Sequence, residues 1–351
     1  MQICDKPFKT YDELIDKMIE KHIIVEDKQF AKQALLNCSY YNLVNRYQHI
    51  LASPSEPTKF VQGVTFEQLY TLYTLDMSLS NILLKYILYI EKSLKSKLSY
   101  VVSEAFGEST SSSDGTYKTL SGYLDRKNYS TSNKLRDTTI RKIFAVLDYA
   151  QDPRSYRIKY NKKEYISESL KHYASKHNHI PPWILTTSLM FGQVENWYSI
   201  LKSSEKTEVV KSFIPASDLS DEEKKEFLKK SLVLLRSFRN SIAHGGQITK
   251  PYKDKIPKMQ LVLLSHGLLN DHDYMNSKSA QSGIHALICA IIALINDEYL
   301  ESSIIQDLYT LFIEYDNDEI LINSKRVWCH FGLPNDFMFR IRKEYNILMI
   351  K

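Results

Sequence analysis

Glycine and proline, the residues that most often interrupt regular structure, are scarce in this chain. Ten glycines and ten prolines occur in 351 residues, about half of the roughly 12% that average usage would give. So few interruptions argue against an all-β sandwich and against a nucleotide-binding α/β fold with a glycine-rich fingerprint. No alternating apolar–polar segment is long enough for a convincing sheet. The composition therefore predicts an all-α fold built from long helices.

Cysteines and long apolar runs are also few. The paired cysteine spacings of zinc ribbons and redox motifs are absent, since the four cysteines stand far apart, at Cys4, Cys38, Cys289 and Cys329. Such scattered cysteines fit the reducing cytosol better than a disulfide scaffold. The most apolar segment, residues 284–295, has twelve residues, fewer than the roughly 20 that span a bilayer. With no apolar signal core at the N-terminus, we expect a cytoplasmic protein without a membrane partner.

Three capping boxes predict where helices begin. Thr10–Glu13, Thr65–Gln68 and Ser220–Glu223 each place a hydroxyl three residues before an acidic or amide side chain. In such a box the two side chains satisfy free backbone N–H groups reciprocally. Residues 66–106 contain no glycine or proline, and their apolar residues recur every three or four positions. This spacing predicts one long amphipathic helix.

Small and polar residues predict helix ends and loops. The helix that begins after Ser220 is expected to end at Gly245 and Gly246. The serine-rich segment 108–116 is interpreted as a flexible loop. A further helix is expected over about residues 279–296.

The positive charge of the chain is concentrated in one segment. The whole chain has 46 basic and 41 acidic residues, a net charge of +5. Residues 118–176 contain fourteen Lys and Arg against six Asp and Glu, a net +8, so the remainder sums to −3. Seven tyrosines are interleaved with these cations. Cations for phosphates and flat rings for unstacked bases are typical of single-stranded RNA surfaces, but a solvated helical face has the same composition.

The basic residues of this segment are therefore candidates for RNA binding, and no DNA partner is expected. These candidates are Lys134, Arg136, Arg141, Lys142, Arg154, Arg157, Lys159, Lys162 and Lys163. Three nearby histidines, His172, His177 and His179, form a poor metal motif because no carboxylate or cysteine accompanies them at the usual spacing. We expect a basic loop there, ahead of Pro181 and Pro182, and no bound metal.

Residues 234–247, LLRSFRNSIAHGGQ, combine an apolar stripe with polar residues that the stripe does not require. Arg239 and His244 are five residues apart, about 7.5 Å along a helix. The small Ser241 and Ala243 would let another backbone approach closely. If the same helix end of a second protomer packs here, two arginines and two histidines converge in one cleft. Asn240 would orient the histidine or contact a phosphate.

Such a cluster has the groups that metal-free RNA cleavage requires. A neutral His244 would take the proton of a ribose 2′-hydroxyl, and a second, protonated histidine would donate to the leaving 5′-oxygen. Arg239 would stabilise the charge on the pentavalent phosphate with a planar fork that lysine lacks. The products would be a 2′,3′-cyclic phosphate and a 5′-hydroxyl, and no cofactor is needed.

A purely structural interpretation stays open for the same residues. Arginine and histidine near a helix C-terminus are favoured by the helix dipole. An arginine five residues before a histidine also occurs often by chance. Arg236, one turn before Arg239, is assigned to a salt bridge or to RNA binding rather than to catalysis.

Arg239–His244 resembles the R-N-x-x-A-H form of the HEPN ribonuclease motif. Other segments follow in an order similar to that of the Abi-like family of bacterial abortive-infection proteins, the AbiD/AbiF group. These segments are Lys6–Ile15, Ser39–Tyr47, Leu75-Asp76 with Ile90–Leu94, Pro182-Trp183 and Phe191-Gly192. The likeness extends to about Pro334. Many members have histidine or a basic residue where this chain has Gly245 and Gly246.

The resemblance implies a HEPN-type helical bundle over residues 63–252. Helical extensions would occupy residues 1–62 and 253–351, and the basic, tyrosine-rich segment would be an insertion at about 108–180. The resemblance also implies a metal-independent endoribonuclease, a toxin or abortive-infection effector in phage defence that acts as a homodimer and is controlled by a small regulatory non-coding RNA. The alternative is a non-catalytic RNA-binding partner in a toxin–antitoxin or defence complex. A weaker alternative is a helical scaffold that binds no RNA.

Overall fold

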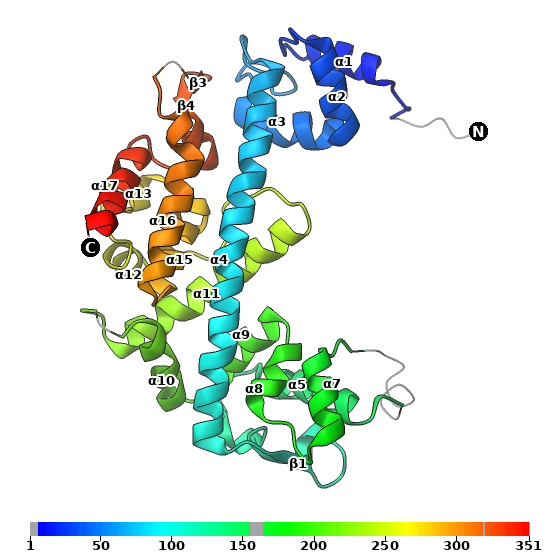
Figure 1. Cartoon of the computed structure of the whole chain (residues 1–351), viewed down its shortest axis with the longest axis vertical. Helices are drawn as coiled ribbons and strands as arrows, with labels where there is room; N and C mark the ends of the chain where they lie inside the picture. Colours follow the sequence, from blue (N-terminus) through cyan, green and yellow to red (C-terminus); the bar gives the residue numbers. More distant parts are fainter. Residues whose placement is uncertain (1–5, 155–163, 216, 319, 351) are drawn as a thin grey trace.

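The fold is organised around one very long helix. The structure is a computed structural model that describes residues 6–154, 164–215, 217–318 and 320–350. Helix α4 (Phe66–Phe106) follows the long axis of the molecule, and other elements pack along it (Figure 1). The predicted capping box of Thr65 and Gln68 starts α4, with both hydrogen bonds at 3.2 Å. Gly107 ends it with a φ of +81°, a conformation that favours glycine.

Short helices form the N-terminal end of the molecule. They are α1 (Tyr11–Glu20), α2 (Lys28–Asn37), the π-helical turn η1 (Tyr41–Asn45) and α3 (Arg46–Leu51). The predicted capping box of Thr10 and Glu13 is present at the start of α1. Ile24 exchanges backbone hydrogen bonds of 2.9 Å with Val64 and Phe66. These bonds fasten the N-terminal helices to the beginning of α4.

The rest of the chain is a series of helices with two small strand pairs (Figure 1). In chain order these elements are β1 (Thr110–Ser112), β2 (Leu120–Gly122), α5 (Arg136–Gln151), α7 (Glu168–Lys176), α8 (Pro182–Leu185), α9 (Phe191–Ile200), α10 (Ser203–Phe213), α11 (Asp221–Ala243), α12 (Lys258–Leu263), α13 (Asp271–Asn276), α14 (Lys278–Ser282), α15 (Ile284–Leu294), α16 (Glu298–Phe312), β3 (Leu321–Ile322), β4 (Lys325–Arg326) and α17 (Phe337–Ile350).

Helix α11 connects the sequence motif to the core. The predicted capping box of Ser220 and Glu223 fixes its N-terminus. Its apolar stripe, which includes Phe227, Leu232 and Phe238, is fully buried, and the helix packs against α4, α9, α10 and α15. Burial of each large apolar side chain contributes about 1.5–3 kcal/mol. The core therefore holds α11 along its length and determines where its C-terminal end lies.

Two predictions about local structure were wrong in detail. The segment 108–116, predicted to be a flexible loop, contains β1, which pairs antiparallel with β2. Its serine and threonine hydroxyls pair across the strands, as in the 2.6 Å bond from Thr110 to the carbonyl of Ser121. The helix predicted over 279–296 is divided into α14 and α15 because the backbone of Gly283 is extended. Gly283 also lies close to Ser279, since a Cβ at Gly283 would be 2.7 Å from the Cα of Ser279. Apart from the pairs β1–β2 and β3–β4, the described elements are helical, which confirms the all-α prediction.

Three of the tyrosines that the sequence associated with RNA bases are core residues instead. Tyr123, Tyr129 and Tyr149 are buried. The hydroxyl of Tyr129 donates to the carbonyl of Tyr123 at 2.6 Å and accepts a 2.9 Å bond from the indole of Trp197. The hydroxyl of Tyr123 donates to the carbonyl of Ile180 at 2.8 Å. Buried tyrosines need such partners, so the rings of Tyr123 and Tyr129 stabilise the segments around them and are closed to RNA.

The most apolar helix, α15, lies inside the protein core. In the part of the chain that the structure describes, no helix combines the length and apolar character needed to cross a membrane. His285 is the polar residue of α15, and its Nε2 donates to the carbonyl of Leu268 at 2.9 Å. Burial lowers the pKa of His285 from 6.5, and this hydrogen bond opposes the change.

Stability below about pH 6.5 is therefore expected to depend on His285. The unfolded chain binds a proton there that the folded chain does not. The free energy of unfolding therefore falls as the pH drops below about 6.5, by at most about 1.4 kcal/mol per pH unit. The His285→Gln variant keeps a hydrogen-bond donor but has no group that titrates there. Its free energy of unfolding, measured by chemical denaturation at about pH 7 and pH 5.5, should therefore fall less between the two pH values than that of the unaltered protein. The exposed His272→Gln is the matched control, and equal pH dependence in all three proteins would contradict the prediction.

Candidate functional site

The end of α11 presents the three predicted catalytic residues. Arg239 and Asn240 lie near its last turn, and His244 is its C-cap residue. Asn240 and His244 are exposed, and Arg239 is half-buried. Among the described residues, none forms a hydrogen bond or ion pair with the imidazole of His244. The imidazole is therefore available to a ligand.

Two glycines end α11 immediately after His244. Gly245 has a left-handed φ of +68°, and the N–H groups of Gly245 and Gly246 donate to the carbonyls of Ile242 and Ser241 at 3.0 and 2.7 Å. This is a Schellman motif, which favours glycine at the first position beyond the cap. A Cβ at Gly246 would lie 2.3 Å from the Ser241 hydroxyl oxygen. The close approach that the small Ser241 permits is thus made by the chain's own loop.

Arg46, the first residue of α3, holds this loop against α4. Its guanidinium donates to the carbonyls of Gly245 and Gly246 at 3.0 and 2.7 Å. The same group donates to both carboxylate oxygens of Asp76 in α4, at 3.1 and 3.2 Å. The side chain of Gln247 in turn donates to the backbone carbonyl of Arg46. Arg46 therefore joins three segments of the chain beside the predicted catalytic histidine.

Asp76 is the buried centre of this cluster. It is 2% exposed and also accepts hydrogen bonds from the hydroxyls of Tyr47 at 3.1 Å and Ser80 at 3.3 Å. Burial raises the pKa of Asp76, and the charge of Arg46 opposes that rise. A buried carboxylate is tolerated only when it is paired and hydrogen-bonded. Removing Arg46 would therefore leave the buried carboxylate of Asp76 without its cation and destabilise the fold.

A second buried carboxylate lies beside Arg239. Glu91 of α4 is 7% exposed, and its Oε2 is 4.0 Å from the Nε of Arg239. Its Oε1 is 3.0 Å from the Nζ of Lys95. Arg239 also donates to the side-chain carbonyl of Asn240 at 3.4 Å. Glu91 thus attracts one edge of the Arg239 guanidinium, while 38% of the Arg239 side chain remains open to solvent.

Arg236 is engaged in a separate ion pair. Its Nε donates to Glu195, a buried residue of α9. Burial raises the pKa of Glu195, and the charge of Arg236 opposes the rise. Gly192 makes room for this pair, because a Cβ there would lie 3.3 Å from the Cδ of Arg236. The predicted salt bridge is present, and the RNA-binding role of Arg236 stays a prediction.

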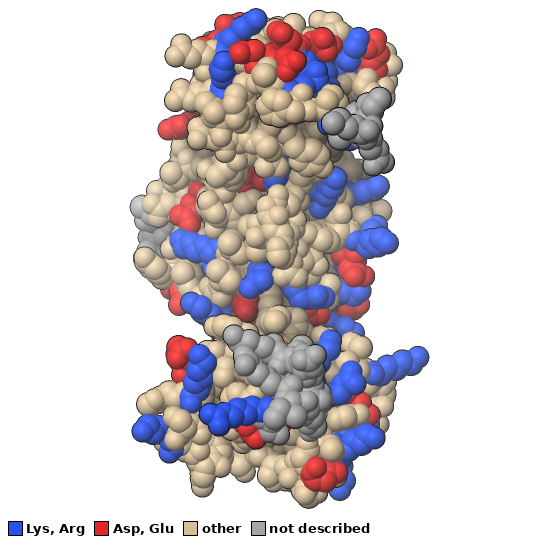
Figure 2. Space-filling model, turned by 90° about the vertical axis from the view of Figure 1, so that its right-hand side faces the viewer, with Lys and Arg blue, Asp and Glu red and all other residues tan. Residues whose placement is uncertain are grey.

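The structure describes only some of the basic candidates in residues 118–176. Arg136 donates to Asp137 at 3.0 Å. Four candidates are exposed: Lys134, Arg141, Lys142 and Arg154. Four others lie outside the described residues: Arg157, Lys159, Lys162 and Lys163. Lys and Arg side chains border the lower part of the face drawn in Figure 2. Whether these candidates bind RNA stays a prediction.

The histidine-containing segment ahead of Pro181 is partly helical. Ser167 caps α7 by accepting a 3.2 Å bond from the N–H of Leu170, and the burial of Leu170 anchors the helix. His172 therefore belongs to a helix and not to the predicted basic loop. In the described ranges, no three His, Cys, Asp or Glu side chains are grouped so that they could hold a metal ion.

Sequence reasoning missed the partners that position the motif. Arg46, Asp76 and Glu91 all stood within segments quoted for the family resemblance, but none was assigned a role. One signal was available, because Asp76 and Glu91 fall on the buried side of α4. An acidic residue on a buried face needs a cationic partner. Glu195 was not singled out by any of these patterns.

The chain was also compared with models of known protein families. The model of the Abi-like protein family matches residues 33–249, a range that includes Arg46, Asp76, Glu91 and the whole of Arg239–His244. Searches of curated proteins and of solved structures gave no significant match.

Proposed function

The chain belongs to the Abi-like protein family, and on this premise we propose that it is a HEPN-type endoribonuclease that works without a metal ion as an abortive-infection effector in phage defence. The placement of Arg239 and His244 carries the proposal. Both stand at the accessible end of a helix that the core holds, and the Nε of Arg239 lies 4.0 Å from the buried Glu91 carboxylate while part of its side chain is in solvent. A catalytic side chain has to be both held and accessible.

The proposed reaction follows from the chemistry of these groups. The neutral imidazole of His244 accepts the proton of a ribose 2′-hydroxyl, and the 2′-oxygen attacks the adjacent phosphorus. The new 2′-O–P bond closes a ring as the P–O5′ bond breaks, and a protonated histidine supplies a proton to the leaving 5′-oxygen. Arg239 stabilises the charge that develops on the phosphate oxygens, and Asn240 supports it. The products are a 2′,3′-cyclic phosphate and a 5′-hydroxyl.

The proposal includes a homodimer in which the ends of two α11 helices face each other. Base and acid catalysis need two histidines, and each chain contributes His244 at this position. A cytoplasmic location and control by a small non-coding RNA belong to the same proposal. The exposed basic residues of the insertion, such as Lys134 and Arg141, would then hold RNA away from the site of cleavage.

Incubation of the purified protein with RNA in excess EDTA tests this function. We expect cleavage to continue in EDTA, with 2′,3′-cyclic phosphates at the new 3′ ends and hydroxyls at the new 5′ ends. The 5′-hydroxyl ends would accept a labelled phosphate directly from polynucleotide kinase. Loss of cleavage in EDTA, or 5′-phosphate ends, would contradict the proposal. RNA that binds tightly and is never cut would support the alternative, a non-catalytic RNA-binding partner.

A further inference from the structure

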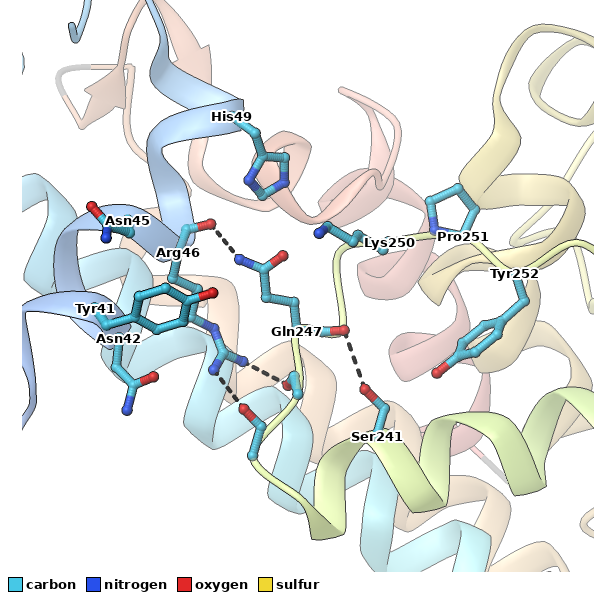
Figure 3. A pocket seen from close by; sticks show the side chains of 12 residues that line it. Tyr41, Asn42, Asn45, Arg46, His49, Ser241, Gln247, Lys250, Pro251 and Tyr252 are labelled. Atoms are coloured by element: carbon cyan, nitrogen blue, oxygen red, sulfur yellow. Dashed lines mark hydrogen bonds between the residues drawn. The ribbon is translucent and has the colours of Figure 1, made fainter. Parts of the chain in front are cut away.

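A pocket of about 660 Å³ opens directly beside the loop that follows His244. One wall comes from η1 and α3, and the other from residues 245–252 and from Ser241 (Figure 3). The side chain of Gln247 extends from the second wall toward the first, where it donates to the backbone carbonyl of Arg46 (Figure 3). The volume is within the range of roughly 300–1,000 Å³ that small-molecule sites occupy. The pocket is therefore large enough for a nucleotide.

The pocket is lined by cations and lacks a carboxylate among its described lining residues. The charge of Arg46 is balanced by Asp76 behind the wall, which leaves Lys250 and His49 facing the opening. The amine of Lys250 points toward the ring of His49 (Figure 3). Burial lowers the pKa of His49, the charge of Lys250 lowers it further, and a hydrogen bond with the backbone of Arg46 opposes both. The lowered pKa favours a neutral His49, so Lys250 supplies the positive charge by which this wall attracts an anion.

An aromatic ring and amide groups complete the pocket. Tyr41 is 71% exposed, although Leu43 and Val44 of the same π-helical turn are buried. Its ring borders the pocket beside the amides of Asn42 and Asn45 (Figure 3). An exposed aromatic ring offers a stacking surface to any base, and amides can pair with base edges. An acidic peptide would use the cations but not this combination.

We propose that this pocket binds one nucleotide of a single-stranded RNA, with the base on Tyr41 and the phosphate at Lys250 and His49. The inference rests on the proposed function, because it assigns the pocket to a nucleotide next to the phosphate that the 2′-oxygen attacks with His244 as the base. The pocket includes Gly245, the residue that directly follows His244. A strand held there would be positioned as it enters the site of cleavage.

Equilibrium binding of a fluorescein-labelled ten-nucleotide RNA, measured by anisotropy in a His244→Ala background, tests the proposal. Tyr41→Ala and Lys250→Ala should each raise the Kd about tenfold, the order expected for a lost stacking or phosphate contact. Lys250→Ala should also lower the slope of log K against log salt by about 0.7. The matched controls are the exposed Tyr100→Ala and Lys253→Ala, which lie outside the pocket and should leave the Kd unchanged.

The outcomes separate this proposal from the proposed function. If the otherwise unaltered chain cleaves RNA, and Tyr41→Ala and Lys250→Ala bind it like their controls, the pocket assignment is overturned while the ribonuclease stands. If no protein cleaves RNA, but these two variants bind it more weakly than their controls, the pocket assignment stands and the ribonuclease fails. If adenosine monophosphate binds more tightly than the RNA, the ligand of the pocket is a free nucleotide and not an RNA strand, and the proposal is overturned. Displacement of the RNA by polyglutamate as readily as by unlabelled RNA would overturn nucleotide recognition.

Discussion

Replacing His244 with alanine is expected to lower the rate of RNA cleavage by about 10²–10⁴-fold, the contribution of general acid–base catalysis by a side chain. The upper end is expected because a homodimer carries the change twice and loses base and acid together. Arg239→Ala should cause a similar loss, because the developing charge on the phosphate then lacks its donor. Initial rates on a fluorogenic RNA in EDTA measure both effects.

The His244→Ala variant should remain folded. The imidazole is exposed and has no bonding partner among the described residues, so the free energy of unfolding should stay within about 0.5 kcal/mol of the wild type. His272→Ala, which changes another exposed histidine, is the matched control and should cleave at the full rate. Undiminished cleavage by His244→Ala would remove this residue from catalysis.

Replacing Arg46 with alanine is expected to lower the free energy of unfolding by about 3–5 kcal/mol, the cost of breaking a buried ion pair by removing one partner. The change leaves the carboxylate of Asp76 buried without its cation. It also removes the donors to the carbonyls of Gly245 and Gly246. Cleavage should fall as well, because the loop that follows His244 loses its attachment to α4. Urea denaturation measures the stability, and cleavage is assayed where the variant is folded.

A paired substitution separates stability from positioning. Arg46→Met combined with Asp76→Leu removes both charges, so most of the lost stability should return, while the bonds to the glycine carbonyls stay absent and cleavage stays low. Lys32→Ala breaks an exposed ion pair with Asp12 and should have little effect. If Arg46→Ala proves as stable as Lys32→Ala, the cluster does not hold the loop.

Local interactions made much of the helical framework predictable. The three capping boxes were confirmed because the groups that form each box are three residues apart, so their hydrogen bonds depend little on the rest of the chain. The absence of glycine and proline from residues 66–106 predicted α4, because helix formation there depends on the residues of the segment itself. Gly245 marked the end of α11 because its own backbone adopts the left-handed conformation that ends a helix.

Interactions between distant segments were not predictable in this way. Arg46 contacts the carbonyl of Gly245, which lies 199 residues later, and no local pattern relates the two positions. The short strand β1 formed in a segment whose composition indicated a loop, because β2 supplies partners for its backbone and hydroxyls. The tyrosine pattern associated Tyr129 with an RNA surface, because nothing local in the sequence indicates that Trp197, 68 residues later, packs against it and helps to bury it.

The sequence by itself determined the helical class, the beginnings and ends of the main helices, and the presence of Arg239 and His244 at one end of a single helix. The tertiary structure alone decided which charges are paired and which stay accessible. In the folded chain Arg236 pairs with Glu195 and Arg46 pairs with Asp76, while His244 stays exposed to solvent. The physical reason is that the cost of removing a charge from water far exceeds local conformational preferences. That cost depends on which segments meet, and only the folded chain brings them together.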